Sequence, residues 1–174
     1  MLMRQALKIL PFLMLLFSFQ ATAGDNIILM RHALAPGIGD PPNFQIDDCS
    51  TQRNLSEEGI AQAQEIGRRL AAKGLVPTRI LTSPWCRCID TAKALNLGDY
   101  DIHAGLASFF EGHVDREQTL SLLRKELAHI GEDELVLFVT HQVVIQALTG
   151  VYVKSGAYLL EDSSRFKRPS LQAE

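Results

Sequence analysis

The sequence predicts an α/β fold of three layers, in which helices cover both faces of a mostly parallel sheet. Strongly apolar runs of strand length, "NIILM" at 26–30 and "ELVLFVT" at 134–140, are typical of strands buried on both faces. Amphipathic segments of helix length lie between the predicted strands. Strands and helices therefore alternate along the chain, and this order favours a parallel sheet covered on both sides.

The predicted elements follow from local signals. In chain order they are a strand at 26–30, a long loop at 33–53, a helix at 54–74, a strand at 78–83, a helix at 83–95, an irregular segment at 100–114, a helix at 116–131, a strand at 134–140, a helix at 141–150 and an edge strand at 156–161. Asn54 or Ser56 can cap the first helix, and Gly74 ends it. Ser83 and Pro84 can open the second helix as its cap and its first-turn proline.

Two helices show clear apolar faces. The face of the helix at 54–74 consists of Ile60, Ala63, Gly67 and Leu70, and that of the helix at 116–131 consists of Leu120, Leu123, Leu127 and Ile130. This spacing places each set on the side that we expect to pack on the sheet. The loop at 33–53 has no such pattern, and a loop of about twenty residues in a compact domain is usually functional.

Residues 1–23 resemble a signal peptide. Arg4 and Lys8 precede and flank an apolar run, and Ala21-Thr22-Ala23 supplies small residues at a cleavage spacing. The run is about half the ~20 residues that a membrane-spanning helix needs, so we expect removal of the leader and no stable membrane insertion. Residues 24–174 are then one domain, located in the periplasm or secreted.

The charge balance argues against nucleic acid as a partner. The chain has 17 Lys and Arg against 20 Asp and Glu, a net charge of −3, and loss of the leader would make the charge more negative. A basic surface stripe is the usual mark of a nucleic-acid-binding protein, and only the tail "RFKRP" is basic. We therefore expect a small-molecule partner.

Export would allow a disulfide among the three cysteines, Cys49, Cys86 and Cys88. In a helix at 83–95, Cys88 lies on the apolar side and Cys86 roughly 100° away. We expect a Cys49–Cys86 disulfide and a buried Cys88 thiol. The spacing of Cys86 and Cys88 is C-x-C rather than the C-x-x-C of zinc and redox sites, and no metal site is predicted.

Four basic or imidazole side chains follow the ends of predicted strands: Arg31, His32, Arg87 and His141. Ligands of parallel α/β sheets bind at the carboxyl ends of the strands, so we expect these residues to converge. Arginine offers paired donors that match phosphate oxygens, and a helix N-terminus favours an anion. The sequence therefore predicts a phosphate site.

The two histidines can take different roles in phosphoryl transfer. A neutral imidazole can attack phosphorus and form a covalent intermediate, while a second imidazole can stabilise the oxygens of the transferred group. An acid must also protonate the leaving alkoxide. Glu111 is the first candidate for this acid, and Asp40, Asp48 and Asp115 are the alternatives.

Three segments, "LMRHA", "SPWCRCIDTA" and "VTHQVVI", resemble together the signature segments of the histidine phosphatase superfamily, the phosphoglycerate mutase-like family. The resemblance covers residues 26 to about 150. It implies that His32 is the phosphorylated nucleophile, that Arg31 and Arg87 bind the phosphoryl group together with His141, and that the chemistry needs no metal or other cofactor.

The resemblance leads to the hypothesis of a phosphatase that hydrolyses phosphomonoesters through a phosphohistidine. Ala33 stands where the family usually has glycine, and Gln142 replaces a small residue after the second histidine. These departures weaken an interpretation as a mutase. A phosphomutase or phosphotransferase, or a non-catalytic protein that binds phosphorylated ligands on the same fold, remains the alternative.

Overall fold

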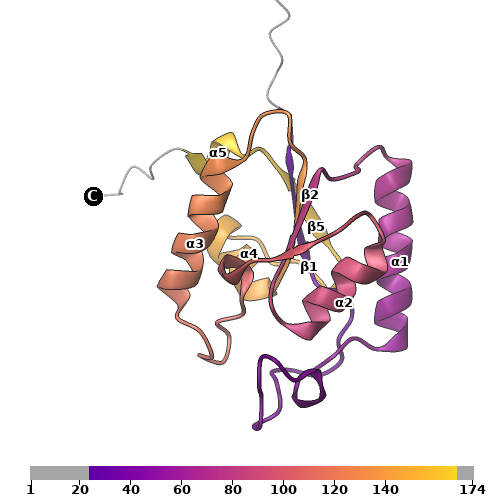
Figure 1. Ribbon diagram of the computed structural model, residues 1–174, viewed down its shortest axis with the longest axis vertical. Helices are drawn as coiled ribbons and strands as arrows, with labels where there is room; N and C mark the ends of the chain where they lie inside the picture. Colours follow the sequence, from indigo (N-terminus) through magenta and orange to yellow (C-terminus); the bar gives the residue numbers. More distant parts are fainter. Residues whose placement is uncertain (1–23, 168–174) are drawn as a thin grey trace, which may run out of the picture.

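The computed structural model describes residues 24–167, so the predicted signal peptide lies outside the described residues. One sheet has helices on both of its faces (Figure 1). The strands are β1 (Ile27–Arg31), β2 (Arg79–Thr82), β3 (Asp101–Ile102), β4 (Val136–Thr140) and β5 (Tyr158–Glu161). The helices are α1 (Glu57–Ala72), α2 (Cys86–Leu95), α3 (Arg116–His129), α4 (Gln142–Thr149) and α5 (Ser164–Lys167), with 3-10 turns η1 (Cys49–Thr51) and η2 (Ala104–Leu106).

The sheet has the strand order β3-β2-β4-β1-β5. All neighbouring strands are parallel except β5, which runs antiparallel to β1 at the edge. The predicted α/β class, the mostly parallel sheet and the edge position of the last strand are confirmed. The sequence did not predict β3, which has two residues, both exposed, and therefore shows no apolar pattern.

Successive residues of the central strands pack on opposite faces of the sheet. Leu29 and Phe138 belong to a buried cluster with residues of α3 and α4. Met30 and Leu137 belong to a second cluster with residues of α1 and α2. Burial on both faces explains why these strands are continuously apolar. The predicted three layers are therefore present, with α1 and α2 on one side of Figure 1 and α3, α4 and α5 on the other.

Helix α1 begins after Ser56, whose side chain accepts a hydrogen bond from the amide of Gly59. Its buried positions include the predicted Ala63, Gly67 and Leu70, but Ile60 is exposed, contrary to the expectation. A side chain at position 67 would place its Cβ 1.9 Å from the carbonyl oxygen of Leu95. Glycine therefore allows α1 and α2 to approach closely.

Helix α2 begins three residues later than expected. Its N-cap is Trp85, which makes no side-chain capping hydrogen bond, and its first residue is Cys86. Ser83 is therefore not the cap. The Ser83 hydroxyl lies instead against His141 in the site described below. On α3, the predicted face of Leu120, Leu123, Leu127 and the following Ile130 is fully buried.

The loop at 33–53 is more ordered than the sequence suggested. It contains η1, which Asp48 caps by accepting from the amide of Ser50. The Gln52 side chain also donates to the carbonyl oxygens of Gln45 and Ile46. These hydrogen bonds hold the loop in place beyond the carboxyl end of β1.

Among the described helices, none has both the length and the apolar character required to cross a bilayer.

Candidate active site

The two histidines meet because β1 and β4 end side by side. These strands are parallel with Arg31 opposite Thr140, and the His32 amide donates to the Thr140 carbonyl at 2.9 Å. The residue after each strand is a histidine, and the ring centroids of His32 and His141 lie 5.5 Å apart. The convergence expected from the strand ends is therefore present.

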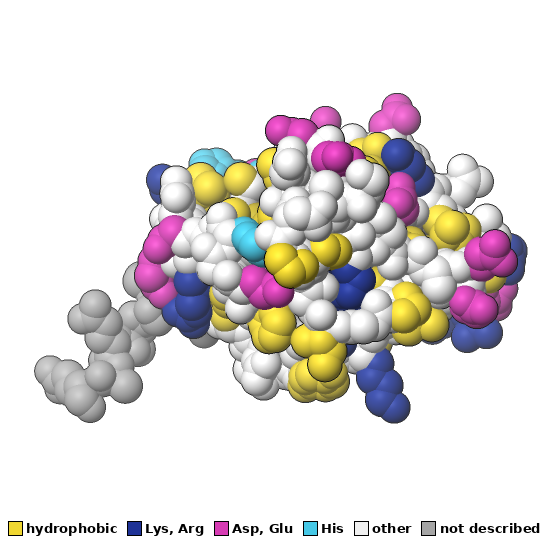
Figure 2. Space-filling view, turned by 90° about the horizontal axis from the view of Figure 1, so that it is seen from below, with side chains coloured by type: hydrophobic (Ala, Val, Ile, Leu, Met, Phe, Trp, Pro, Cys, Tyr) yellow, Lys and Arg dark blue, Asp and Glu magenta, His cyan; other side chains and the backbone are white. Residues whose placement is uncertain are grey.

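All five predicted catalytic residues line one pocket of about 250 Å³: Arg31, His32, Arg87, Glu111 and His141. Figure 2 views the molecule from the edge where the parallel strands end and shows Lys or Arg side chains deep in a hollow, with hydrophobic side chains around it. The pocket thus combines a cationic interior with a partly apolar border.

His32 is held as a neutral imidazole. Its Nδ1 lies 2.7 Å from the carbonyl oxygen of Ala33, which can only accept, so Nδ1 carries the hydrogen and Nε2 keeps its lone pair. Burial, assisted by the charges of Arg87 and Arg31, lowers the pKa of His32 to about 3. Nε2 is therefore available as a nucleophile throughout the neutral pH range.

His141 is also neutral in the free site, because burial and the charge of Arg87 lower its pKa well below the usual value. Its Nε2 lies 2.8 Å from the Ser83 hydroxyl, which itself accepts from the amide of Trp85. The Ser83 hydrogen is then free to donate to Nε2, which leaves the hydrogen of His141 on Nδ1. That N–H can donate to a phosphate oxygen.

Two arginines reach the pocket from different elements. Arg31 ends β1 and donates from Nη1 to the Val153 carbonyl at 3.1 Å, and Arg87 lies in the first turn of α2. The Nε atoms of both are buried and have no hydrogen-bond partner among the described residues. Because unpaired buried donors are costly, these two groups indicate a place for an anion.

The N-terminus of α2 contributes less than the sequence suggested. The Cys86 amide donates to the Gln52 side chain at 2.9 Å, so it is already satisfied by the loop. Arg87 itself is almost fully buried and pairs with Asp40 at 2.8 Å. Arg87 is therefore not a solvent-exposed surface arginine.

Asp40 holds the arginines rather than donating a proton. Its carboxylate accepts from Arg87, from the Trp85 indole and from the amide of Arg53. Burial alone would raise the pKa of Asp40, but the hydrogen bonds from Arg53 and Arg87 hold it below its usual value. A carboxylate kept ionised in this way is a poor general acid.

Glu111 is better placed for the acid role. It lines the pocket, is partly exposed, and accepts from the Asp40 amide at 2.7 Å through Oε2. The other two alternatives cap local structure, because Asp48 accepts from Ser50 and Asp115 accepts from Gln118 at the start of α3. Neither of these aspartates lines the pocket.

Arg53 is a pocket residue that the sequence analysis missed. Its guanidinium donates to the carbonyl oxygens of Gly39 and Ala35, and it also lines the pocket with Arg31 and Arg87. The signal that could have found it is its position at the end of the long loop, three residues before Ser56, the N-cap of α1.

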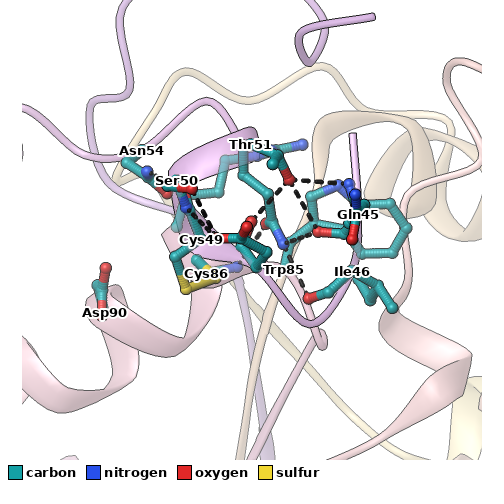
Figure 3. The surroundings of a disulfide bond; sticks show 12 residues. Gln45, Ile46, Cys49, Ser50, Thr51, Asn54, Trp85, Cys86 and Asp90 are labelled. Carbon is teal, nitrogen blue, oxygen red and sulfur yellow. Dashed lines mark hydrogen bonds between the residues drawn. A yellow bond between two sulfur atoms is a disulfide. The ribbon is translucent and has the colours of Figure 1, made fainter. Parts of the chain in front are cut away.

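The Cys49–Cys86 disulfide ties this loop to α2 (Figure 3), with Cα atoms 5.7 Å apart. Cys86 precedes Arg87, so the cross-link joins the loop that carries Asp40 to the turn that carries the phosphate-site arginine. Cys88 is a buried thiol, as expected, and burial raises its pKa to about 12. This thiol is therefore protonated and unreactive.

The model of a family described as the histidine phosphatase superfamily (branch 1) matches residues 27–125. That range contains the first histidine, the loop, and Arg87. No curated protein matches the sequence.

Several solved structures have the same fold. A protein from Agrobacterium tumefaciens, described as a candidate phosphohistidine phosphatase SixA, is 25% identical over 79% of this chain and 91% of its own, with a TM-score of 0.51. The protein histidine phosphatase SixA in complex with tungstate is 18% identical over 79% and 89%, with a TM-score of 0.54. A mycobacterial glucosyl-3-phosphoglycerate phosphatase is 16% identical over 78% and 88%, with a TM-score of 0.54.

Proposed function

Because the chain belongs to the histidine phosphatase superfamily, we propose that it hydrolyses phosphomonoesters through a phosphohistidine on His32. The observation that carries the proposal is the convergence of a neutral imidazole and two unpaired arginine Nε groups on one pocket. Membership of the superfamily supports a phosphatase or phosphotransferase type of enzyme. The nucleophile and the class of ester are part of the proposal.

In the first step, Nε2 of His32 attacks phosphorus and the bond between phosphorus and the alcohol oxygen breaks. Glu111 gives its proton to the departing alkoxide. Arg31, Arg87 and His141 hold the equatorial oxygens, where negative charge is greatest in the transition state. The bound phosphate dianion favours the protonated form of His141, which strengthens this contact.

In the second step, water attacks the phosphohistidine and the phosphorus–nitrogen bond breaks. The Glu111 carboxylate, left ionised by the first step, accepts a proton from this water. Neutral His32 and a protonated Glu111 are regenerated, and inorganic phosphate leaves. The Nδ1 hydrogen of His32 stays hydrogen-bonded to the Ala33 carbonyl oxygen throughout, so the ring keeps its orientation.

Export to an oxidising compartment is the second part of the proposal. The signal-like residues 1–23 and the Cys49–Cys86 disulfide both support it, because disulfides persist mainly outside the cytosol. An esterase in the periplasm or outside the cell would act on small phosphorylated compounds of the envelope or of the medium.

A protein phosphohistidine is the second candidate substrate, because one similar structure is described as a candidate phosphohistidine phosphatase and another as a protein histidine phosphatase. The leaving group would then be an imidazole rather than an alkoxide. The same pocket and the same nucleophile would serve both reactions. A phosphorylated histidine-containing domain therefore belongs in the substrate panel.

The test is phosphate release by the protein without residues 1–23 against sugar phosphates, alkyl phosphates, lipid phosphates and phosphohistidine proteins. We expect release from at least one ester and a transient, acid-labile phosphoenzyme. His32→Ala should abolish both, whereas His129→Ala, at the exposed end of α3, should change neither. Full activity of the His32→Ala variant would refute the mechanism, and a phosphoenzyme stable for minutes without acceptor would favour a mutase.

A further inference from the structure

Three exposed apolar side chains surround the mouth of the phosphate pocket. Ile38, Phe110 and Tyr152 line the pocket and are 91%, 59% and 67% exposed. They come from three separate segments: the long loop, the turn before α3 and the connection between α4 and β5. Single exposed apolar residues are common, but a group of them around one pocket marks a binding surface.

The backbone around Ile38 is adapted to present this side chain. Gly37 and Gly39 flank it with φ angles of 92° and 71°, a region that other residues rarely adopt. A Cβ at position 39 would also lie 2.4 Å from a carboxylate oxygen of Glu111. The two glycines thus place Ile38 in a sharp bend, and Gly39 in this bend lies against the candidate acid Glu111.

The Gln142 side chain holds the backbone on both sides of Tyr152. It accepts a hydrogen bond from the Val153 amide at 2.9 Å and donates one to the Val151 carbonyl oxygen at 3.5 Å. The carbonyl oxygen of Val153 in turn accepts a hydrogen bond from Arg31. Gln142 therefore fixes the backbone that carries Tyr152 relative to an arginine of the phosphate site.

The charges of the pocket favour a single anion. Arg53, the cation beyond the two phosphate-site arginines, already donates to the carbonyl oxygens of Gly39 and Ala35. Beyond Arg53 and the two phosphate-site arginines, the described residues that line the pocket include no Lys or Arg, so a second anionic group on the alcohol part of a substrate would find no free cation there.

We infer that the site selects phosphomonoesters whose alcohol is an apolar chain or ring without a second anionic group. This inference rests on the proposed function and names its substrate class. The phosphate would occupy the interior with His32, while the carbons nearest to it would cover Ile38, Phe110 and Tyr152. Burial of these carbons against the rim would supply affinity that a polyhydroxylated or acidic alcohol lacks.

The first experiment measures binding of alkylphosphonates by calorimetry, which needs no turnover. Across methyl, propyl, butyl and hexyl phosphonate, we expect the affinity to rise by about twofold to fourfold per added methylene until the rim is covered. Carboxyethylphosphonate should bind more weakly than butylphosphonate. Equal affinities along the series, or tighter binding of the carboxylate compound, would overturn the inference.

Two rim variants and one control variant test whether Ile38 and Tyr152 cause the dependence of affinity on chain length. Ile38→Ser and Tyr152→Ser should flatten the chain-length dependence, so that each variant loses more affinity for hexylphosphonate than for methylphosphonate. Ile102→Ser changes an exposed isoleucine on β3, which does not line the pocket, and should keep the full dependence. A dependence that survives in both rim variants would contradict the inference, since the apolar contact would then lie elsewhere.

A turnover assay compares two phosphomonoesters with an apolar alcohol, one soluble and one in a lipid bilayer. Phosphate release is measured from soluble hexyl phosphate and from vesicles that contain phosphatidate, and either should exceed release from glycerol phosphate. Alkyl leaving groups have similar basicity, so the comparison reports burial rather than leaving-group chemistry. Glycerol phosphate hydrolysed faster than both would refute the inference.

The two proposals fail in different ways. Chain-length-dependent phosphonate binding without any phosphohistidine would refute the proposed hydrolysis and support the rim as a binding surface. Phosphohistidine formation with a flat phosphonate series would confirm the nucleophile and refute the apolar substrate class.

Discussion

Asp40 and Arg87 form a buried ion pair at 2.8 Å, although 47 positions separate them in the sequence. Both side chains are less than 5% exposed. The pair joins the long loop to the first turn of α2, and it orients a guanidinium whose Nε remains unpaired. The carboxylate therefore determines where Arg87 can meet a phosphate.

Replacement of Asp40 by asparagine should leave the Arg87 charge buried and uncompensated. We expect a loss of about 3 kcal/mol in the free energy of unfolding, measured by urea denaturation. Saturating inorganic phosphate should recover part of this loss, because its charge then compensates the arginine. Asp48→Asn is the control, since Asp48 is exposed and only caps η1. An unchanged urea midpoint for Asp40→Asn would contradict this account.

Glu111→Gln tests the acid. The amide keeps an oxygen that can accept from the Asp40 amide, so the fold should be unaffected. We expect the rate of phosphoenzyme formation from an alkyl phosphate to fall by roughly 10²-fold to 10⁴-fold, and the rate from nitrophenyl phosphate to fall much less, because nitrophenolate leaves without a proton.

The control for this prediction is Asp115→Asn, since asparagine caps a helix as well as aspartate does. Equal losses in the rate of phosphoenzyme formation from the alkyl and the nitrophenyl ester in Glu111→Gln would assign Glu111 a structural role instead. Loss of alkyl phosphate turnover in the Asp115 variant would reopen the choice of acid.

The sequence predicts the core of the site because each contributing signal is local. An apolar run marks a strand end, and parallel strands bring their carboxyl ends together, so Arg31, His32 and His141 can be placed without knowledge of any side-chain contact. The irregular parts escape this reasoning. Arg53 and Asp40 meet Arg87 through a loop without periodicity, where no spacing rule reports which side chains touch.

The errors of detail also have physical causes. Ile60 was expected in the core, but the face of α1 that packs inward contains Gly59 instead, which allows close contact with the Leu34 backbone. Ser83 was expected as a helix cap, but its hydroxyl lies against His141. In both cases a close tertiary contact overrides a local preference.

Removal of the disulfide should weaken both the fold and the site. A cross-link between residues 37 positions apart contributes about 4 kcal/mol in the chain-entropy model. The Cys49→Ser and Cys86→Ser double variant should lose about this much in urea, and its KM should rise because the loop with Asp40 is no longer tied to α2. The exported, non-reduced protein should show the Cys49–Cys86 cross-link by mass spectrometry.

Reduction of the wild-type protein should reproduce the double variant. Cys88→Ala is the control, because this buried thiol is not part of the disulfide. The Cys88→Ala variant should have the wild-type KM before reduction, and its KM should rise after reduction as that of the wild-type protein does. Three free thiols in the exported protein would refute the cross-link and remove one support for export.

The two buried histidines should make the protein sensitive to acid. His32 has a folded-state pKa of about 3, and that of His141 is also depressed, so below pH 6.5 the unfolded chain binds protons that the folded chain does not. The free energy of unfolding should therefore fall as pH decreases from about 6.5, by about 1.4 kcal/mol per pH unit for each histidine.

His32→Gln should remove the contribution of one histidine to this slope between pH 6 and pH 4.5, measured by urea denaturation, whereas His129→Gln should retain the full slope. Phosphate should reduce the slope as well, because a bound dianion favours the protonated form of His141. A stability that is constant from pH 6.5 to pH 4.5 would show that these imidazoles take up protons in the folded protein as readily as in the unfolded chain, and it would contradict the depressed pKa of His32.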